Sequence, residues 1–210
     1  MSECINENAI PCKVIMVGDS GVGKTSIIGR YLNKFNEKEK STIGASFSNK
    51  ISIIDKYKIS FDIWDTAGQE RYRSVSSIFY KEAYLCIFVY DITEPNSFEN
   101  IKNYWYKTVM ENASPKIILG IAGNKNDLYE KEKVKEKEVQ KFCKEIDALY
   151  FSTSALLNNS IDDMFIKLGK KFIASQTFKH LWTTIIGNDD KKLNFKVIKK
   201  KRKKKKNGFC

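Results

Sequence analysis

The chain has 210 residues, of which 42% are hydrophobic, enough to form the core of one globular domain with an appendage. Its formal net charge is +12, but residues 176–210 alone hold 12 basic and 2 acidic side chains, a net +10 that leaves +2 for residues 1–175. A fold that binds nucleic acid through a basic surface of its own domain is therefore disfavoured, and we expect no nucleic-acid partner.

The five cysteines are far apart in sequence, which argues against a zinc site or a disulfide framework and favours a reducing compartment. Cys86 lies in an apolar run, so we expect it in the core. The chain has no run of about 18 apolar residues, so we expect no membrane span. The first residues do not resemble a secretory signal, and Ser2 stands where N-myristoylation needs glycine.

Short apolar runs alternate with helical patterns along most of the chain. Strands are predicted at residues 12–17, 46–54, 58–64, 84–90, 116–122 and 149–152. Helices are predicted at residues 24–32, 97–111, 134–148 and 161–174. A short polar turn at 55–57 favours an antiparallel hairpin. This alternation predicts an α/β fold, a six-stranded, mostly parallel sheet with one antiparallel edge strand and helices on both faces.

Three parts are expected: an N-terminal extension (1–10), the α/β domain (11–175) and a tail (176–210). After Ala174 the apolar residues show no sustained period, and residues 199–206 are eight consecutive cations. Such a block repels itself, so we expect the tail to be disordered in water.

The strongest motif is GDSGVGKT at residues 18–25, directly after a predicted strand and opening a predicted helix. It matches the phosphate-binding loop of nucleotide-binding proteins in full. Glycines let successive backbone N–H groups face phosphate oxygens, and the helix adds its positive amino end. Lys24 would meet the β- and γ-phosphates, and the Thr25 hydroxyl would bind Mg²⁺.

The run NKND at residues 124–127 selects the base, because it follows the predicted strand at 116–122, where ligands bind in open α/β sheets. The Asp127 carboxylate can accept hydrogen bonds from N1–H and the 2-amino group of guanine. Adenine lacks both donors, and a buried polar group left unpaired is how a site rejects an analogue. GTP and GDP are therefore the expected ligands.

Two further segments point at the γ-phosphate. Asp65 follows the predicted strand at 58–64 and could reach Mg²⁺, the Gly68 N–H could hold the γ-phosphate, and Gln69 could orient the attacking water. Thr42 could complete the metal shell only when a γ-phosphate is present. Two segments held by one phosphate form a switch with two states.

The order and spacing of these motifs, with Ser154-Ala155-Leu156, resemble the Ras superfamily of small GTPases over about residues 13–172. TIGASF (42–47), WDTAGQERY (64–72) and YDIT (90–93) are similar to the Rab branch. IAGNKNDL (121–128) and TIGASF are most similar to its endosomal subgroup.

The resemblance implies a role for each matched residue. Nucleotide binding is implied for Ser20, Gly21, Val22, Gly23, Lys24, Thr25, Ser26, Phe35, Thr42, Gly68, Asn124, Lys125, Asp127, Ser154, Ala155 and Leu156. In this match the Ala155 N–H contacts guanine O6 and Phe35 packs across the guanine edge. Mg²⁺ binding is implied for Thr25, Thr42 and Asp65, hydrolysis for Gln69, and effector contact for Phe47, Trp64 and Phe79.

This chain departs from the family pattern in three places. Leu156 stands where the family usually has lysine, and the path from Lys24 to Phe35 is one residue shorter than usual. Rabs usually end in two cysteines for geranylgeranylation, whereas here only Cys210 stands at the end. One lipid anchors marginally, so the cations at 199–206 would supply the second membrane signal.

The resemblance implies a monomeric GTPase that is slow without a GTPase-activating protein. It also implies an exchange factor, effectors, a GDP-dissociation inhibitor and prenylation machinery as partners. An anionic membrane surface and the cytosolic face of endosomal or other vesicles complete the expectation. Two alternatives stay open: a guanine-nucleotide scaffold with negligible turnover, and a nuclear-transport GTPase with the basic tail as an import signal.

Overall fold

The computed structural model describes residues 8–36, 42, 44–66 and 77–185. They contain one six-stranded sheet with the strand order β2-β3-β1-β4-β5-β6. The strands are β1 (Ile10–Val17), β2 (Ala45–Ile54), β3 (Tyr57–Thr66), β4 (Leu85–Asp91), β5 (Ile118–Asn124) and β6 (Ala148–Ser152). β2 and β3 pair antiparallel, and the other neighbours pair parallel. The predicted fold class is confirmed.

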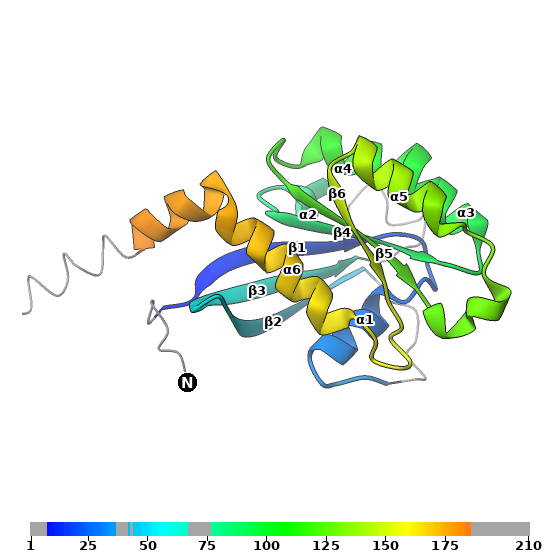
Figure 1. Ribbon diagram of the computed structural model, residues 1–210. Coiled ribbons are helices and arrows are strands. Elements are labelled where there is room, and N and C mark those ends of the chain that lie inside the picture. Colours follow the sequence, from blue (N-terminus) through cyan, green and yellow to red (C-terminus); the bar gives the residue numbers. More distant parts are fainter. Residues whose placement is uncertain (1–7, 37–41, 43, 67–76, 186–210) are drawn as a thin grey trace, which may run out of the picture.

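Helices cover both faces of this sheet (Figure 1). They are α1 (Lys24–Tyr31), α2 (Ser77–Tyr80), α3 (Pro95–Asn100), α4 (Tyr106–Asn112), α5 (Glu136–Glu145) and α6 (Ile161–Ala174). α1 and α6 lie on one face, and α3, α4 and α5 lie on the other (Figure 1). A π-helical segment, Ile101–Trp105, joins α3 to α4, and a 3₁₀ segment, Asn126–Lys131, follows β5.

The central strands β4 and β5 correspond to continuous apolar runs in the sequence. Every residue of β4 and β5 is buried, because each strand has helices on both sides. One apolar cluster joins the sheet to α1 and α6, with Ile27, Phe165 and Phe172 among its members. A second cluster on the opposite face includes Phe98 and Cys86, which is buried as expected.

The predicted hairpin is present. A two-residue turn at Asp55 and Lys56, with φ of 45° and 75°, joins β2 to β3. Left-handed backbone at both central positions twists in the sense that antiparallel strands need. Tyr57, which the pattern placed in the turn, is the first residue of β3.

Two predicted helices have different bounds. The helix expected at 97–111 is helical from Pro95 to Asn112, with the π-helical segment in its middle. The helix expected at 134–148 ends at Glu145, because Asp147 takes a left-handed conformation with φ of 52° and Ala148 already pairs with Leu119 in the sheet.

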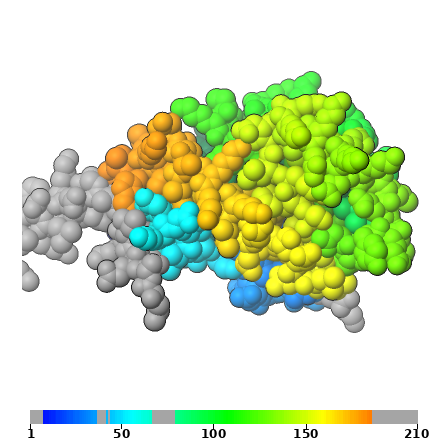
Figure 2. All heavy atoms as spheres, in the orientation of Figure 1, coloured from blue at the N-terminus to red at the C-terminus, as the bar shows by residue number. Residues whose placement is uncertain are grey.

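Residues 176–185, which the sequence pattern assigned to the tail, are helical and pack on the domain. Phe178 is only 4% exposed and contacts Tyr57 edge to face at 5.1 Å between ring centroids. Trp182 contacts the same tyrosine at 5.0 Å. Figure 2 shows this segment (orange) against the β2–β3 hairpin (cyan). The folded body therefore continues past residue 175 to residue 185.

The other predictions for the two ends of the chain concern residues outside the described ranges. The cation run at 199–206 lies outside the described residues, and the three-part division of the chain stays a prediction. Among the helices that are described, none combines the length and the hydrophobicity that crossing a bilayer requires.

Candidate functional site

The phosphate loop lies between β1 and α1, at the carboxyl edge of the sheet. Gly18 (φ 148°) and Gly23 (φ 97°) both need glycine. A Cβ on Gly18 would lie 2.2 Å from the Val89 carbonyl oxygen, and one on Gly23 would lie 2.3 Å from Asn124 Nδ2. The loop is therefore packed against β4 and β5 so closely that neither position has space for a side chain.

Lys24 is buried beneath this loop, with 6% of its surface exposed. Its Nζ donates hydrogen bonds of 2.8 Å to the Gly18 and Asp19 carbonyl oxygens. Burial lowers the pKa of the ammonium to about 8, while the Asp65 and Asp19 carboxylates act in the opposite direction. Two backbone carbonyls thus hold a cation at the place that phosphate binding requires.

Three oxygen-bearing side chains from three separate segments meet beside Lys24. Thr25 Oγ1 donates to Asp65 Oδ2 at 2.5 Å, and the Thr25 and Thr42 hydroxyls are 2.8 Å apart. Thr42 Oγ1 also donates to Asp65 Oδ2, at 3.3 Å. Hydroxyl and carboxylate oxygens are the ligands that Mg²⁺ prefers, and the cation normally fills its shell with water and phosphate oxygens. This set of residues fits Mg²⁺.

The phosphate loop has a support that the motif did not reveal. The Asp19 carboxylate accepts hydrogen bonds from Asn100 Nδ2 at 2.6 Å and from Trp105 Nε1 at 2.8 Å. Asn100 directly precedes the π-helical segment and Trp105 is its last residue; such a distortion is frequent near functional sites. Nothing in the local sequence around either partner signals this contact, because 81 and 86 residues separate Asp19 from them.

Asn124 connects the phosphate-loop motif to the 154–156 loop, which is predicted to bind the base. Its Nδ2 donates to the Val22 carbonyl oxygen at 2.9 Å, and its Oδ1 accepts the Ala155 N–H at 3.2 Å. Asp127 Oδ1 accepts a short hydrogen bond from the Ser154 hydroxyl. The predicted base-binding residues of the NKND run and of the 154–156 loop are therefore neighbours, although about thirty residues of chain separate them.

Lys125 is fixed by Asp91, a residue of the YDIT run to which the sequence assigned no role. It has a left-handed backbone with φ of 66°, and its Nζ lies 2.7 Å from Asp91 Oδ2. Burial raises the pKa of Asp91, but hydrogen bonds from Lys125 and Thr93 outweigh burial and hold that pKa below its usual value. Asp91 ends β4 beside Asn124, so the ion pair aligns the base-binding segment with the sheet.

The other predicted nucleotide-binding residues occupy the same edge. Ser20 and Gly21 are exposed on the loop, Val22 is buried, and Ser26 is half-buried in α1. Phe35 follows α1, with its ring 3.5 Å from the guanidinium carbon of Arg30. The Leu156 side chain is 46% exposed. Gly68, Gln69 and Cys210 lie outside the described residues.

The three aromatic residues matched to effector binding form one row. Phe47 contacts Trp64 with 5.3 Å between ring centroids, and Trp64 contacts Phe79 at the same distance. Phe47 is 56% exposed on the outer face of β2, and Lys13 Nζ lies 5.5 Å from the Trp64 ring. The row therefore combines an exposed apolar end with two partly buried rings.

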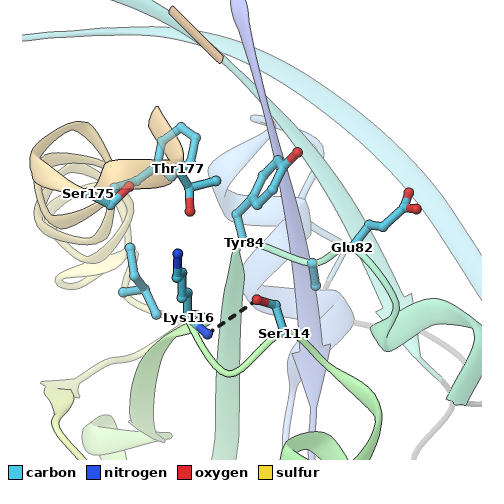
Figure 3. A pocket seen from close by; sticks show the side chains of 9 residues that line it. Glu82, Tyr84, Ser114, Lys116, Ser175 and Thr177 are labelled. Atoms are coloured by element: carbon cyan, nitrogen blue, oxygen red, sulfur yellow. Dashed lines mark hydrogen bonds between the residues drawn. The ribbon is translucent and has the colours of Figure 1, made fainter. Parts of the chain in front are cut away.

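A small crevice of about 50 Å³ lies at the opposite edge of the sheet, where β4 and β5 begin (Figure 3). The residues that line it include Tyr84, Lys116 and Thr177. The Lys116 N–H donates a hydrogen bond to Ser114 Oγ at 3.2 Å. Its volume suits one or two water molecules. It is too small for a nucleotide and remote from the phosphate loop.

Comparison with known proteins agrees with this arrangement. The family model described as Ras family matches residues 13–174, which is well over half of the 210 residues. The match spans β1 to the end of α6 and so includes the phosphate loop, Asp65, the base-binding segment and the 154–156 loop.

Proposed function

Since the chain belongs to the Ras family of small GTP-binding switch proteins, we propose the finer assignment of a Rab-like GTPase that recruits effectors of endosomal membrane traffic while GTP is bound. The observation that carries this proposal is the meeting of Thr25, Thr42 and Asp65 at the carboxyl edge, next to the exposed aromatic Phe47 of the β2–β3 hairpin. The same edge of the sheet would then bind the nucleotide and carry the surface whose conformation depends on whether GTP or GDP is bound.

In this proposal the protein binds the phosphates mainly through backbone N–H groups and one lysine. Backbone N–H groups of the 20–25 loop and the Lys24 ammonium hold the phosphates, and Thr25, Thr42 and Asp65 would hold Mg²⁺. Mg²⁺ supplies positive charge that stabilises the charge developing on the transferred phosphoryl group. Gln69 orients the attacking water, and without an arginine from a partner this hydrolysis is slow.

The switch follows from differential contact. In the proposal Thr42 and the Gly68 N–H would bind a γ-phosphate that GDP lacks, so GTP would favour the arrangement in which both segments are held. Thr42 forms hydroxyl hydrogen bonds with Thr25 and Asp65. It also precedes β2, the strand that carries Phe47, by only a few residues. A change at Thr42 is thus transmitted along the chain to the aromatic row.

The first experiment tests the nucleotide site and its turnover. Calorimetry with Mg²⁺ should register binding of GDP and GTP and no binding of ATP. Single-turnover cleavage of bound GTP should slow by at least tenfold in the Gln69→Leu variant, as expected for loss of a water-positioning group. Equal rates in the two proteins would favour the scaffold with negligible turnover.

The second experiment tests the membrane assignment. We propose that Cys210 is prenylated and that the cations at 199–206 add about 1 kcal/mol each near an anionic leaflet, as an upper bound. Intact mass of protein purified from its native membranes would reveal an isoprenoid. Cell fractionation with and without residues 199–206 separates the alternatives, because soluble nuclear accumulation of the full chain would exclude a vesicle role.

A further inference from the structure

Arg30, near the end of α1, connects this helix to the 154–156 loop. Its Nε donates to the Ala155 carbonyl oxygen at 2.5 Å, and its Nη2 donates to the Leu156 carbonyl oxygen at 2.6 Å. The guanidinium is planar, always charged and forked, so it can bind two neighbouring carbonyls at once in a fixed orientation. The contact joins residues that are 125 and 126 positions apart in sequence.

The end of α1 is shaped so that Phe35 covers this guanidinium. Asn33 takes a left-handed conformation with φ of 58°, and the Lys34 N–H donates to the Gly29 carbonyl oxygen at 2.7 Å. This closure turns the chain back on the helix. As a result the Phe35 ring lies 3.5 Å from the Arg30 guanidinium carbon, a cation–π contact that restricts the arginine side chain further.

The 154–156 loop is also held from its other side. The Ala155 N–H donates to Asn124 Oδ1 at 3.2 Å, and the Ser154 hydroxyl donates to Asp127. Arg30 therefore fixes the carbonyl of the peptide unit that directly follows the Ala155 N–H, while Asn124 and Asp127 fix the inner side. The direction of that N–H depends on both sets of contacts.

We propose that Arg30 is a positioning residue for guanine recognition, which holds the 154–156 loop so that the Ala155 N–H, which donates to Asn124 Oδ1 in this structure, donates to O6 of the base when guanine is bound. The inference rests on the proposed guanine site. The partly exposed Leu156 side chain has no polar group with which to brace the loop itself. In this chain the backbone of residues 155 and 156 is instead braced by Arg30.

The test measures release of two ribose-labelled nucleotides at fixed Mg²⁺, in the presence of excess unlabelled GDP. One is GDP, and the other is the diphosphate of 2-aminopurine riboside, which keeps the 2-amino group but lacks both O6 and the N1–H. Arg30→Ala should release labelled GDP about tenfold faster than the unmodified protein, but should change release of the O6-free nucleotide by less than twofold. Arg30→Lys should fall between, because lysine keeps the charge and loses the fork.

Lys34→Ala is the matched control, since it removes an exposed cation at the same end of α1 and should leave both rates within twofold. Equal acceleration of both nucleotides by Arg30→Ala would overturn the proposal, because it would show general loosening of the site. Unchanged GDP release would overturn it as well. If Arg30→Ala does not fold, Arg30→Gln replaces it, with the same difference between the two nucleotides required. Failure of the unmodified protein to bind GDP would instead refute the proposed function.

Discussion

The helical segment at residues 176–185 should contribute measurably to the stability of the domain, and Phe178→Ala tests this. Phe178 is 4% exposed and lies within 5.1 Å of the Tyr57 ring centroid, 5.6 Å of Phe172 and 6.0 Å of Trp182. Its contacts thus connect the segment to both the β2–β3 hairpin and α6. If the segment were only an appendage, truncating this side chain would cost almost nothing.

Removal of a buried phenylalanine costs about 3–5 kcal/mol of unfolding free energy, with the smaller values where the surroundings can relax into the space. Because Phe178 lies at the end of the domain, we expect about 3 kcal/mol. For a domain of this size, that corresponds to a fall in Tm of about 6–12 °C. Phe47→Ala is the control of the same residue type. Phe47 is 56% exposed, so its loss should cost less than about 1 kcal/mol.

The assay is urea unfolding followed by circular dichroism, with GDP and Mg²⁺ at one saturating concentration, since ligand binding adds its own stabilisation. An unchanged m-value is required, so that the shift in midpoint reports stability alone. A loss below about 0.5 kcal/mol in Phe178→Ala, or a loss equal to that in Phe47→Ala, would refute the reasoning.

Four substitutions at the nucleotide edge should have graded effects. Gly18→Ala places a Cβ against the Val89 carbonyl and should cost about 2–5 kcal/mol in urea unfolding; Gly21→Ala has open space, with only its φ of 79° as a penalty, and should cost about 1 kcal/mol. Asp19→Ala removes two hydrogen bonds and should accelerate release of labelled GDP about tenfold; release within twofold would contradict a supporting role. Asn124→Ala should accelerate the same release by more than tenfold and lower the Tm, because it disconnects both loops.

The strands and the position of the site could be read from the sequence because both are encoded locally. β4 and β5 appear as apolar runs since they are covered on both faces. The chemistry-bearing motifs each follow a strand, and carboxyl ends of parallel strands share one edge. The antiparallel edge hairpin was predictable from two alternating runs around a short polar turn, at Asp55 and Lys56.

The features that could not be predicted are contacts between residues far apart in the sequence. The Arg30 contact to the 154–156 loop and the Asp19 contact to Trp105 depend on how α1 and the π-helical segment are placed on the sheet, and no pattern within either segment specifies the partner. The π-helical segment likewise has no local signature that we can identify. These contacts hold the predicted site residues in place, so the residue types were predictable while their supports were not.

The segment at 176–185 is a different case, because its signal was present. Phe178, Leu181, Trp182 and Ile185 recur at intervals of three, one and three residues, which is the spacing of one helix face. All four pack on the core cluster beside α6. This spacing predicts a short helix within residues 176–185, immediately before the basic run.

The contact between Trp182 and Tyr57 determines how far the C-terminal helical segment lies from Asp65. β3 runs from Tyr57 to Thr66, a length of about 30 Å at roughly 3.3 Å per residue. Asp65 is near one end of this rod and Trp182 is clamped to the other. A partner that contacts the domain at Trp182 therefore binds about the length of a whole strand away from Asp65, at the far end of β3.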